Sequence, residues 1–139
     1  MRICQECGAI STEKRWFYDE QLRQQASRSS EAQYVICPGC QRVHNKRVDG
    51  VVTLSGGYWQ AHRADIMNLI NNEEARTRDK NPLARILDLR DEGGQLVIMT
   101  TNERLAQRIG SVLKRAYSGN LEFRWSHQDR FVRVHWSRD

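Results

Sequence analysis

Two stretches near the C-terminus, 121–126 and 131–136, alternate between apolar and polar residues. Every second residue is a large apolar one: Leu121, Phe123 and Trp125 in the first stretch, and Val132, Val134 and Trp136 in the second. Successive side chains of a β-strand point to opposite faces, so a period of two indicates strands with one buried face. The pattern therefore predicts two strands joined as a hairpin by the polar residues 126–129.

The segment before this pair predicts another hairpin and a helix. Apolar runs at 84–90 and 95–100 flank a Gly-Gly turn, and the second run is apolar on both faces, which indicates an interior strand. Thr101 or Asn102 then caps a helix that reaches Tyr117. The apolar stripe of this helix is Leu105, Ile109, Val112, Leu113 and Ala116. The order of elements from the first hairpin to the C-terminus is ββαββ, which predicts a small antiparallel sheet covered by one helix.

Upstream, residues 55–81 are predicted to form a connecting helix. A Ser-Gly-Gly break separates it from a short strand at 50–54, and Pro82 ends it. One face carries Trp59, Ile66, Leu69 and Ile70 at helical spacing. Glu74 and Arg78 lie one turn apart, where opposite charges attract, so they are expected to form an ion pair.

All four cysteines fall in the first 40 residues, in two pairs of the same spacing. The pairs are Cys4-x-x-Cys7 and Cys37-x-x-Cys40. Two such knuckles supply the four thiolates of a closed tetrahedral metal site, and Gly8 and Pro38-Gly39 provide the residues their turns need. Residues 1–54 are therefore predicted to be a β-rich zinc ribbon. The strand at 50–54 closes this ribbon, and the polar stretch 21–31 is a loop with at most one helical turn.

Zinc is the favoured metal and iron the alternative. The Cys-Pro-Gly-Cys knuckle and Gly8 resemble the rubredoxin iron site, whereas Gln41 replaces the second rubredoxin glycine and this region is slightly basic where rubredoxins are acidic. Thiolate tetrahedra accept either metal. No carboxylate or histidine joins the knuckles, and His44 is expected at the surface. The metal is therefore expected to be structural, without an open position for Lewis-acid catalysis.

The predicted fold class is α+β. Its parts are a four-cysteine zinc ribbon at 1–54, a connecting helix at 55–81 and a ββαββ domain at 82–139. Within the 139 residues no apolar run could span a membrane and no N-terminal secretion signal is visible, which predicts a cytoplasmic protein without membrane contact. With every cysteine assigned to the metal and no paired carboxylates in a catalytic setting, neither an enzyme nor a small-molecule substrate is expected.

The charge is basic, with 22 Lys+Arg against 17 Asp+Glu, and the excess is greatest in the last third. Such a balance is compatible with a polyanion partner. The candidate nucleic-acid contacts are Arg104, Arg108 and Arg115 on the predicted helix, Arg124 and Arg133 beside His135 on the open sheet face, and Arg42, Lys46 and Arg47 after the second knuckle. The helix stripe is favoured because no acidic side chain interrupts its face. The alternative for all three groups, the stripe included, is a solvated surface without a binding partner.

The chain also resembles a small, uncharacterised bacterial family of zinc-ribbon proteins of about 140–170 residues. The resemblance rests on the knuckles and on Gly50-Val51-Val52-Thr53-Leu54-Ser55-Gly56, Ile70-Asn71-Asn72-Glu73-Glu74 and the helix from Thr101 to Gly110. The pattern Leu-Ala-x-x-Ile-Gly-x-x-Leu-Lys-x-Ala-Tyr is more distantly similar to the N-terminal zinc-binding module of the large-ribosomal-subunit export adaptor, the nonsense-mediated-decay-three family. That module has more knuckles and further domains. This resemblance implies attachment to ribosomal RNA or protein.

Three functions are therefore compared. The favoured one is a non-enzymatic zinc-binding module that associates with RNA or the ribosome. The second is a ribbon that binds another protein or DNA. The third is electron transfer at a rubredoxin-like iron site. No phosphate-binding Gly-x-x-x-x-Gly-Lys loop is present, so an ATPase is not expected.

Overall fold

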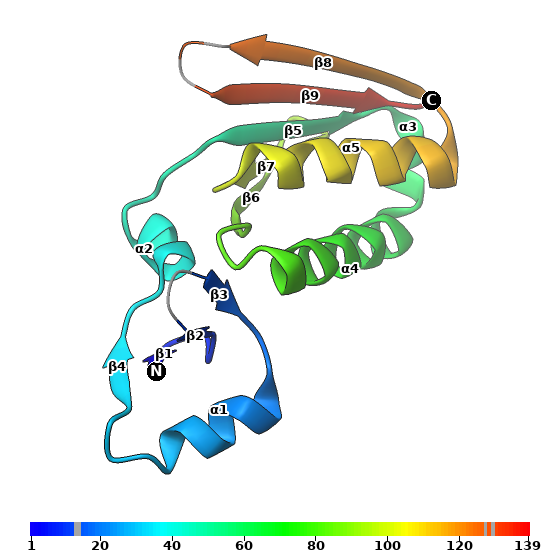
Figure 1. Cartoon of the computed structure of the whole chain (residues 1–139). Coiled ribbons are helices and arrows are strands. Elements are labelled where there is room, and N and C mark those ends of the chain that lie inside the picture. The colour runs from blue at the N-terminus through cyan, green and yellow to red at the C-terminus, as the bar shows by residue number, and fades with distance from the viewer. Residues whose placement is uncertain (13–14, 127, 129) are drawn as a thin grey trace.

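The computed structural model describes residues 1–12, 15–126, 128 and 130–139 and contains two β-sheets with helices packed on them (Figure 1). The N-terminal part contains β1 (Arg2–Cys4), β2 (Ile10–Thr12), β3 (Arg15–Phe17), α1 (Glu20–Ser27), β4 (Gln33–Val35) and α2 (Pro38–His44). The remainder contains β5 (Gly50–Ser55), α3 (Gly57–Ala61), α4 (Arg63–Lys80), β6 (Ile86–Glu92), β7 (Gln95–Thr100), α5 (Glu103–Tyr117), β8 (Asn120–Ser126) and β9 (Phe131–Ser137). The predicted α+β class is confirmed.

The N-terminal sheet is small and contains four strands in the order β3-β2-β1-β4. The first three strands are antiparallel, and β4 pairs with β1 in parallel. Each strand has three residues, and only Ile3, Ile10 and Ala26 form the buried cluster between this sheet and α1. So little apolar burial leaves the N-terminal part dependent on another source of stability.

Helix α1 corrects the prediction of a loop over 21–31. Asp19 caps the helix by accepting a hydrogen bond from the backbone N–H of Leu22 at 3.0 Å, and Glu20 pairs with Arg23 one turn later. The apolar content of this stretch is low, so its periodicity gave almost no signal. Capping and packing of Ala26 on the sheet supply what the sequence pattern lacks.

The second sheet contains five strands in the order β6-β7-β5-β9-β8. The β6–β7 hairpin is confirmed, with Gly93 and Gly94 both at positive φ in its turn, and β7 is an interior strand as predicted. Strands β8 and β9 pair antiparallel as predicted. The predicted buried face holds for Val132, Val134 and Trp136 of β9, whereas Phe123 and Trp125 are exposed on β8, the edge strand of the sheet. The polar turn predicted between them includes residues 127 and 129, which lie outside the described residues.

Strand β5 corrects the predicted sheet. Instead of closing the ribbon, it lies at the centre of the five-stranded sheet, antiparallel to β7 and parallel to β9. The sheet is therefore mixed rather than antiparallel. The alternation of Val52 and Leu54 with Val51 and Thr53 identifies a strand, but it carries no information about which distant strand becomes its partner.

The helices after β5 lie on one face of this sheet, with α5 against the strands and α4 packed against α5 (Figure 1). The core between them is made by Val52, Leu54, Trp59, Ile66, Ile70, Ala84, Leu96, Ile98, Leu105, Ala106, Ile109, Leu113, Val132, Val134 and Trp136. Every member follows residue 50. The sheet and its helices therefore have a hydrophobic core that needs no side chain from the N-terminal part.

Details of the helices confirm and correct the predicted pattern. Asn102 caps α5, whereas Ala116, predicted in its apolar stripe, is exposed. The connecting helix is divided at His62 into α3 and α4. The predicted Glu74–Arg78 pair is wrong, because Glu74 accepts the backbone N–H of Ile86 at 2.6 Å and Arg78 donates to Tyr18. None of the helices in the described ranges is long and apolar enough to cross a membrane.

Candidate metal centre

The four cysteine thiols meet at one point. Cys4 ends β1, Cys37 caps α2 and Cys40 lies in the first turn of α2. All four Sγ atoms, including that of Cys7, lie within 4.8 Å of one another. The Cys4–Cys40 and Cys7–Cys37 Sγ separations are 3.7 Å and 3.6 Å. A tetrahedral ion about 2.3 Å from each sulfur would separate the sulfurs by about 3.8 Å, so the donor set fits one tetrahedral metal ion.

Local backbone geometry holds the knuckles in this arrangement. Gly8 has a φ of 79°, a left-handed conformation that favours glycine, and its N–H donates to the carbonyl of Cys4 at 3.1 Å. Pro38 starts α2, where its fixed φ suits the first helical turn. The backbone N–H of Cys37 donates to Cys4 Sγ at 3.4 Å, and that of Cys40 to Cys37 Sγ at 3.5 Å. These donors stabilise sulfur in its thiolate form.

The cluster is closed to solvent on most sides. Cys4, Cys37 and Cys40 are buried, and Ala9 is buried with them. Among the described residues, these four thiols are the whole metal-ligand group, without a carboxylate or an imidazole. His44 lies at the surface, as predicted, and its Nε2 contacts the carboxylate of Glu6 at 2.8 Å. An arrangement of four sulfurs without a fifth donor suits a structural metal.

A buried arginine from the second half of the chain faces the sulfurs. Arg85 precedes β6 and is only 6% exposed. Its Nη1 donates to Cys40 Sγ at 3.5 Å, and its Nη2 lies 3.6 Å from Cys7 Sγ and 3.8 Å from Cys37 Sγ. Four thiolates around a divalent ion carry two net negative charges, which this guanidinium partly neutralises.

Tyr18 connects the sulfur of Cys7 to Arg78 on α4. Its hydroxyl donates to Cys7 Sγ at 3.4 Å and accepts from Arg85 Nη2 and from Arg78 Nε, both at 3.0 Å. Burial, followed by the hydrogen bond to Cys7, raises the pKa of Tyr18 to about 12, so the hydroxyl keeps its proton and remains a donor. The sequence analysis named neither Tyr18 nor Arg85, and it named Arg78 only as a partner for Glu74. The only signal for Arg85 was a cation between Ala84 and Ile86, in an apolar run.

The surroundings shift the pKa values of the ligand cysteines in opposite directions. The pKa of Cys7 is lowered, whereas the hydrogen bond with Cys7 raises the pKa of Cys37 and burial raises that of Cys40. The hydrogen bond from the Cys37 thiol is the largest cause that lowers the pKa of Cys7, to about 3, and the Tyr18 hydroxyl acts in the same direction. The hydrogen bonds that Arg85 donates to Cys40 and Cys7 keep the pKa of Arg85 above its ordinary value despite burial. A metal binds thiolates and releases thiol protons, so Cys7 is prepared for an ion, while binding of the ion would displace the protons that Cys37 and Cys40 hold.

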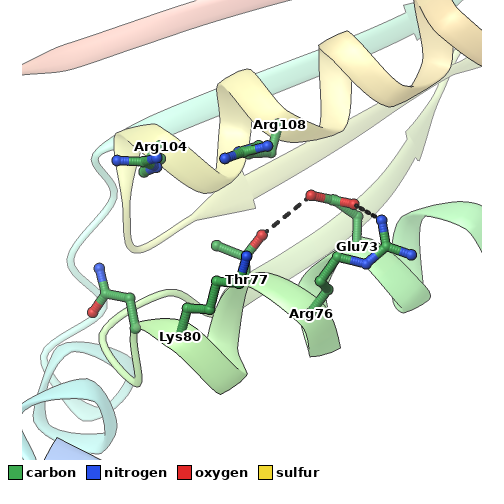
Figure 2. A pocket seen from close by; sticks show the side chains of 7 residues that line it. Glu73, Arg76, Thr77, Lys80, Arg104 and Arg108 are labelled. Carbon is green, nitrogen blue, oxygen red and sulfur yellow. Dashed lines mark hydrogen bonds and ion pairs between the residues drawn. The ribbon is translucent and has the colours of Figure 1, made fainter.

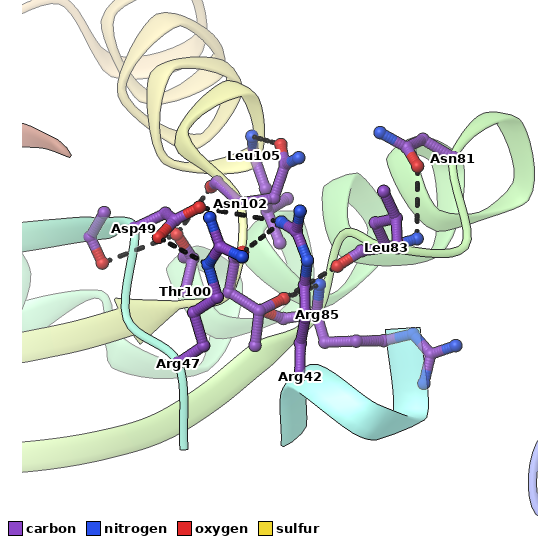
Figure 3. Close-up of polar contacts among 11 residues, drawn as sticks. Arg42, Arg47, Asp49, Asn81, Leu83, Arg85, Thr100, Asn102 and Leu105 are labelled. Carbon is purple, nitrogen blue, oxygen red and sulfur yellow. Dashed lines mark hydrogen bonds and ion pairs between the residues drawn. The ribbon is translucent and has the colours of Figure 1, made fainter. Parts of the chain in front are cut away.

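The junction between the two parts of the chain is formed by α2 and the loop before β6 (Figure 3). Arg42 Nη1 donates to the carbonyl of Thr101 at 3.0 Å and lies 3.6 Å from Asp49. Arg47 also pairs with Asp49, at 3.2 Å. Helix α2 thus contacts the second half of the chain through Arg42, at the residues that precede β5 and follow β7. Arg42 and Arg47 make structural contacts there, while Lys46 is exposed.

The cations predicted on the helix occupy a different surface. Arg104, Arg108 and Arg115 are all exposed on α5, as the periodicity predicts. Arg104 and Arg108 face a cavity between α4 and α5, together with Arg76 and Lys80 (Figure 2). Arg115 lies beyond it, on a shallower hollow that Arg104 and Arg108 also line. The structure thus brings two of the three predicted stripe residues together with two cations of α4.

The sheet-face candidates lie on the other side of the molecule. Arg124 and Arg133 are directly paired across β8 and β9, and they line a hollow with Glu122 and His135 on the face that carries no helix. The guanidinium of Arg133 lies 5.1 Å from the ring centroid of Phe131. This surface is basic but includes an acidic side chain, as predicted.

Fold and site define an α+β protein with a four-cysteine centre able to hold one metal ion. Comparison of the chain with protein-family models, with curated proteins and with solved structures finds no match. The site chemistry therefore carries the functional argument that follows.

Proposed function

We propose that the protein is a non-enzymatic module in which one structural zinc stabilises the N-terminal part and the α4–α5 surface binds RNA, including ribosomal RNA. The observation that carries the RNA proposal is the convergence of cations in one groove. Two arginines of α5 and two cations of α4 face the same cavity. Arginine and lysine side chains facing one groove are typical of phosphate-backbone contacts.

Three of the four groove cations are available to a ligand, while Arg76 lies 3.5 Å from the carboxylate of Glu73. The side chains of Arg104, Arg108 and Lys80 form no hydrogen bond or ion pair with any residue that the structure describes. From Arg104 to Arg115 the helix rises about 16 Å at 1.5 Å per residue, which matches two or three successive phosphates. Arg42 and Arg47, in contrast, already pair with Asp49, which favours the helix surface.

Zinc is proposed because a closed set of four thiolates is typical of structural zinc sites. Such a metal would stabilise the N-terminal part, which has little apolar core of its own. Elemental analysis of purified protein is expected to give one zinc per chain and a colourless solution. Stoichiometric iron with the visible absorption of an iron tetrathiolate would contradict the assignment and favour electron transfer.

Reversing the helix stripe tests the RNA proposal. The triple variant Arg104→Glu, Arg108→Glu and Arg115→Glu is expected to lose RNA or ribosome association while remaining folded, because all three side chains are exposed. Milder neutralisation to glutamine is expected to reduce the slope of log affinity against log salt concentration by about two. Filter binding over a salt series measures both effects, with circular dichroism to check the fold.

A matched triple on the opposite sheet face is the control. The change Arg90→Glu, Arg124→Glu and Arg133→Glu alters net charge by the same amount and is expected to keep most of the binding. If the helix variant binds as the native protein does, the proposal fails at α5, and the surface around Arg42, Lys46 and Arg47 becomes the candidate.

A further inference from the structure

The cavity between α4 and α5 has a negatively charged floor beneath its cationic rim. Its volume is about 290 Å³, near the lower end of the range for ligand pockets. Glu73 contributes to the lining but is only 4% exposed, whereas Arg76, Lys80, Arg104 and Arg108 are exposed around it. Figure 2 shows the Glu73 carboxylate on α4 pointing into the space between the two helices.

The Glu73 carboxylate has unused capacity to accept hydrogen bonds. One oxygen accepts from Thr77 Oγ1 at 3.4 Å and the other lies 3.5 Å from Arg76 Nη1, both near the upper limit for a hydrogen bond. A carboxylate offers about four acceptor positions, so each oxygen retains one. Buried acceptors that lack close donors are costly, and a ligand with two adjacent donors would satisfy both oxygens.

The carboxylate at the floor of the cavity requires a hydrogen-bond donor, whereas the cations at its rim require a negatively charged group, and one ligand must supply both. Phosphate suits the guanidinium groups of Arg104 and Arg108 but would be repelled by Glu73. A neutral group that donates two parallel hydrogen bonds, attached to a phosphate backbone, suits both. Among the RNA bases only guanine presents two adjacent donors, its N1–H and its exocyclic amine, on the Watson–Crick edge. Adenine and cytosine each place an acceptor beside their amine, and uracil flanks its single donor with carbonyls.

We propose that this cavity binds one unpaired guanine of a single-stranded RNA, with Glu73 accepting from its N1–H and amine. The flanking phosphates contact Arg104, Arg108 and Lys80. This inference rests on the proposed RNA function and narrows it, because the Watson–Crick edge of guanine is reachable only where the base is unpaired. Glu73 is then the residue that selects the base, while the arginines hold the backbone.

The test compares labelled eight-nucleotide RNAs that differ at one central position. An all-uridine RNA, and the same RNA with one guanosine, adenosine or inosine, are titrated by fluorescence anisotropy at fixed salt. Inosine lacks only the exocyclic amine of guanosine. The native protein is expected to prefer the guanosine RNA over the adenosine RNA by about tenfold or more, with inosine between them.

Two variants separate base selection from backbone binding. Glu73→Gln keeps the shape but presents an amide donor to the base, so the guanosine preference is expected to fall below about threefold, while affinity for the all-uridine RNA is retained. Asp79→Asn removes the same charge from an exposed position of α4 and is expected to keep the preference.

The outcomes distinguish this inference from the proposed function. Equal, salt-dependent affinity of the native protein for all four RNAs would overturn the guanine site and leave the RNA proposal intact. A guanosine preference that survives Glu73→Gln would overturn the role of Glu73. If none of the RNAs binds, both proposals fail.

Discussion

Replacement of Cys37 by serine is expected to unfold the N-terminal sheet while the five-stranded sheet remains folded. The variant removes one of four metal ligands, and structural zinc contributes on the order of 10–16 kcal/mol in small zinc-binding peptides. The N-terminal part cannot replace this free energy, because among the described residues the fully buried members of its cluster beneath α1 are Ile3, Ile10 and Ala26, with Phe17, Leu22 and Ala32 partly buried against them. The core of the second sheet begins at Val52 and does not depend on the cysteines.

Amide hydrogen exchange can follow the two sheets separately. Protection is expected to disappear from β1 and β2 in Cys37→Ser and to persist in β5, β7 and β9. The native protein with a strong chelator should show the same pattern, and Ser30→Ala, an exposed change in the N-terminal part, should keep full protection. Unchanged protection of β1 in Cys37→Ser would refute the structural role of the metal.

Replacing Arg85 by methionine is expected to weaken metal binding by about 10–100-fold, the usual cost of losing a group that supports metal ligands. Its guanidinium faces three sulfurs and Tyr18 from a site that is 6% exposed. Without it the negative charge of the centre is buried and less compensated, and the free energy of unfolding is expected to fall by about 3–5 kcal/mol.

Competition with a chelator and denaturant unfolding measure these two effects. Arg85→Lys retains the charge without the planar guanidinium. Its metal affinity and its free energy of unfolding should lie between those of the native protein and Arg85→Met. Arg90→Met, an exposed change in the adjoining strand β6, is the matched control and should leave metal affinity unaltered. Native metal affinity in Arg85→Met would mean that the sulfurs need no cation from the second half of the chain.

Features governed by neighbouring residues were predictable from the sequence. The two knuckles specify the metal cluster, the Gly-Gly turn specifies the β6–β7 hairpin, and Asn102 with the stripe around Ile109 specifies α5. Each depends on side chains within a few residues of one another. Turn geometry, capping and helical spacing act over that range, so the pattern contains the necessary information.

Features that depend on distant partners were not predictable. The pattern of β5 identifies a strand, but its neighbours β7 and β9 are selected by the whole fold. Arg85 shows no local sign of contact with sulfurs, since Cys40 lies 45 residues away in the sequence. Glu73 lies in a polar stretch of a predicted helix, which gives no sign that the packing of α4 on α5 buries it. In all three cases tertiary contacts override the local pattern.

The central position of β5 imposes an order on folding during synthesis. Ser55 on β5 contacts His135 on β9, 80 residues later, and β9 is an interior strand of the sheet. Pairings of such high contact order form slowly, and a nascent chain must first deliver its C-terminal residues. The cysteine cluster, by contrast, is complete once residue 40 has emerged. The nascent chain can therefore take up its metal while β5 still lacks β9, and during that interval Val52 and Leu54 remain exposed to aggregation.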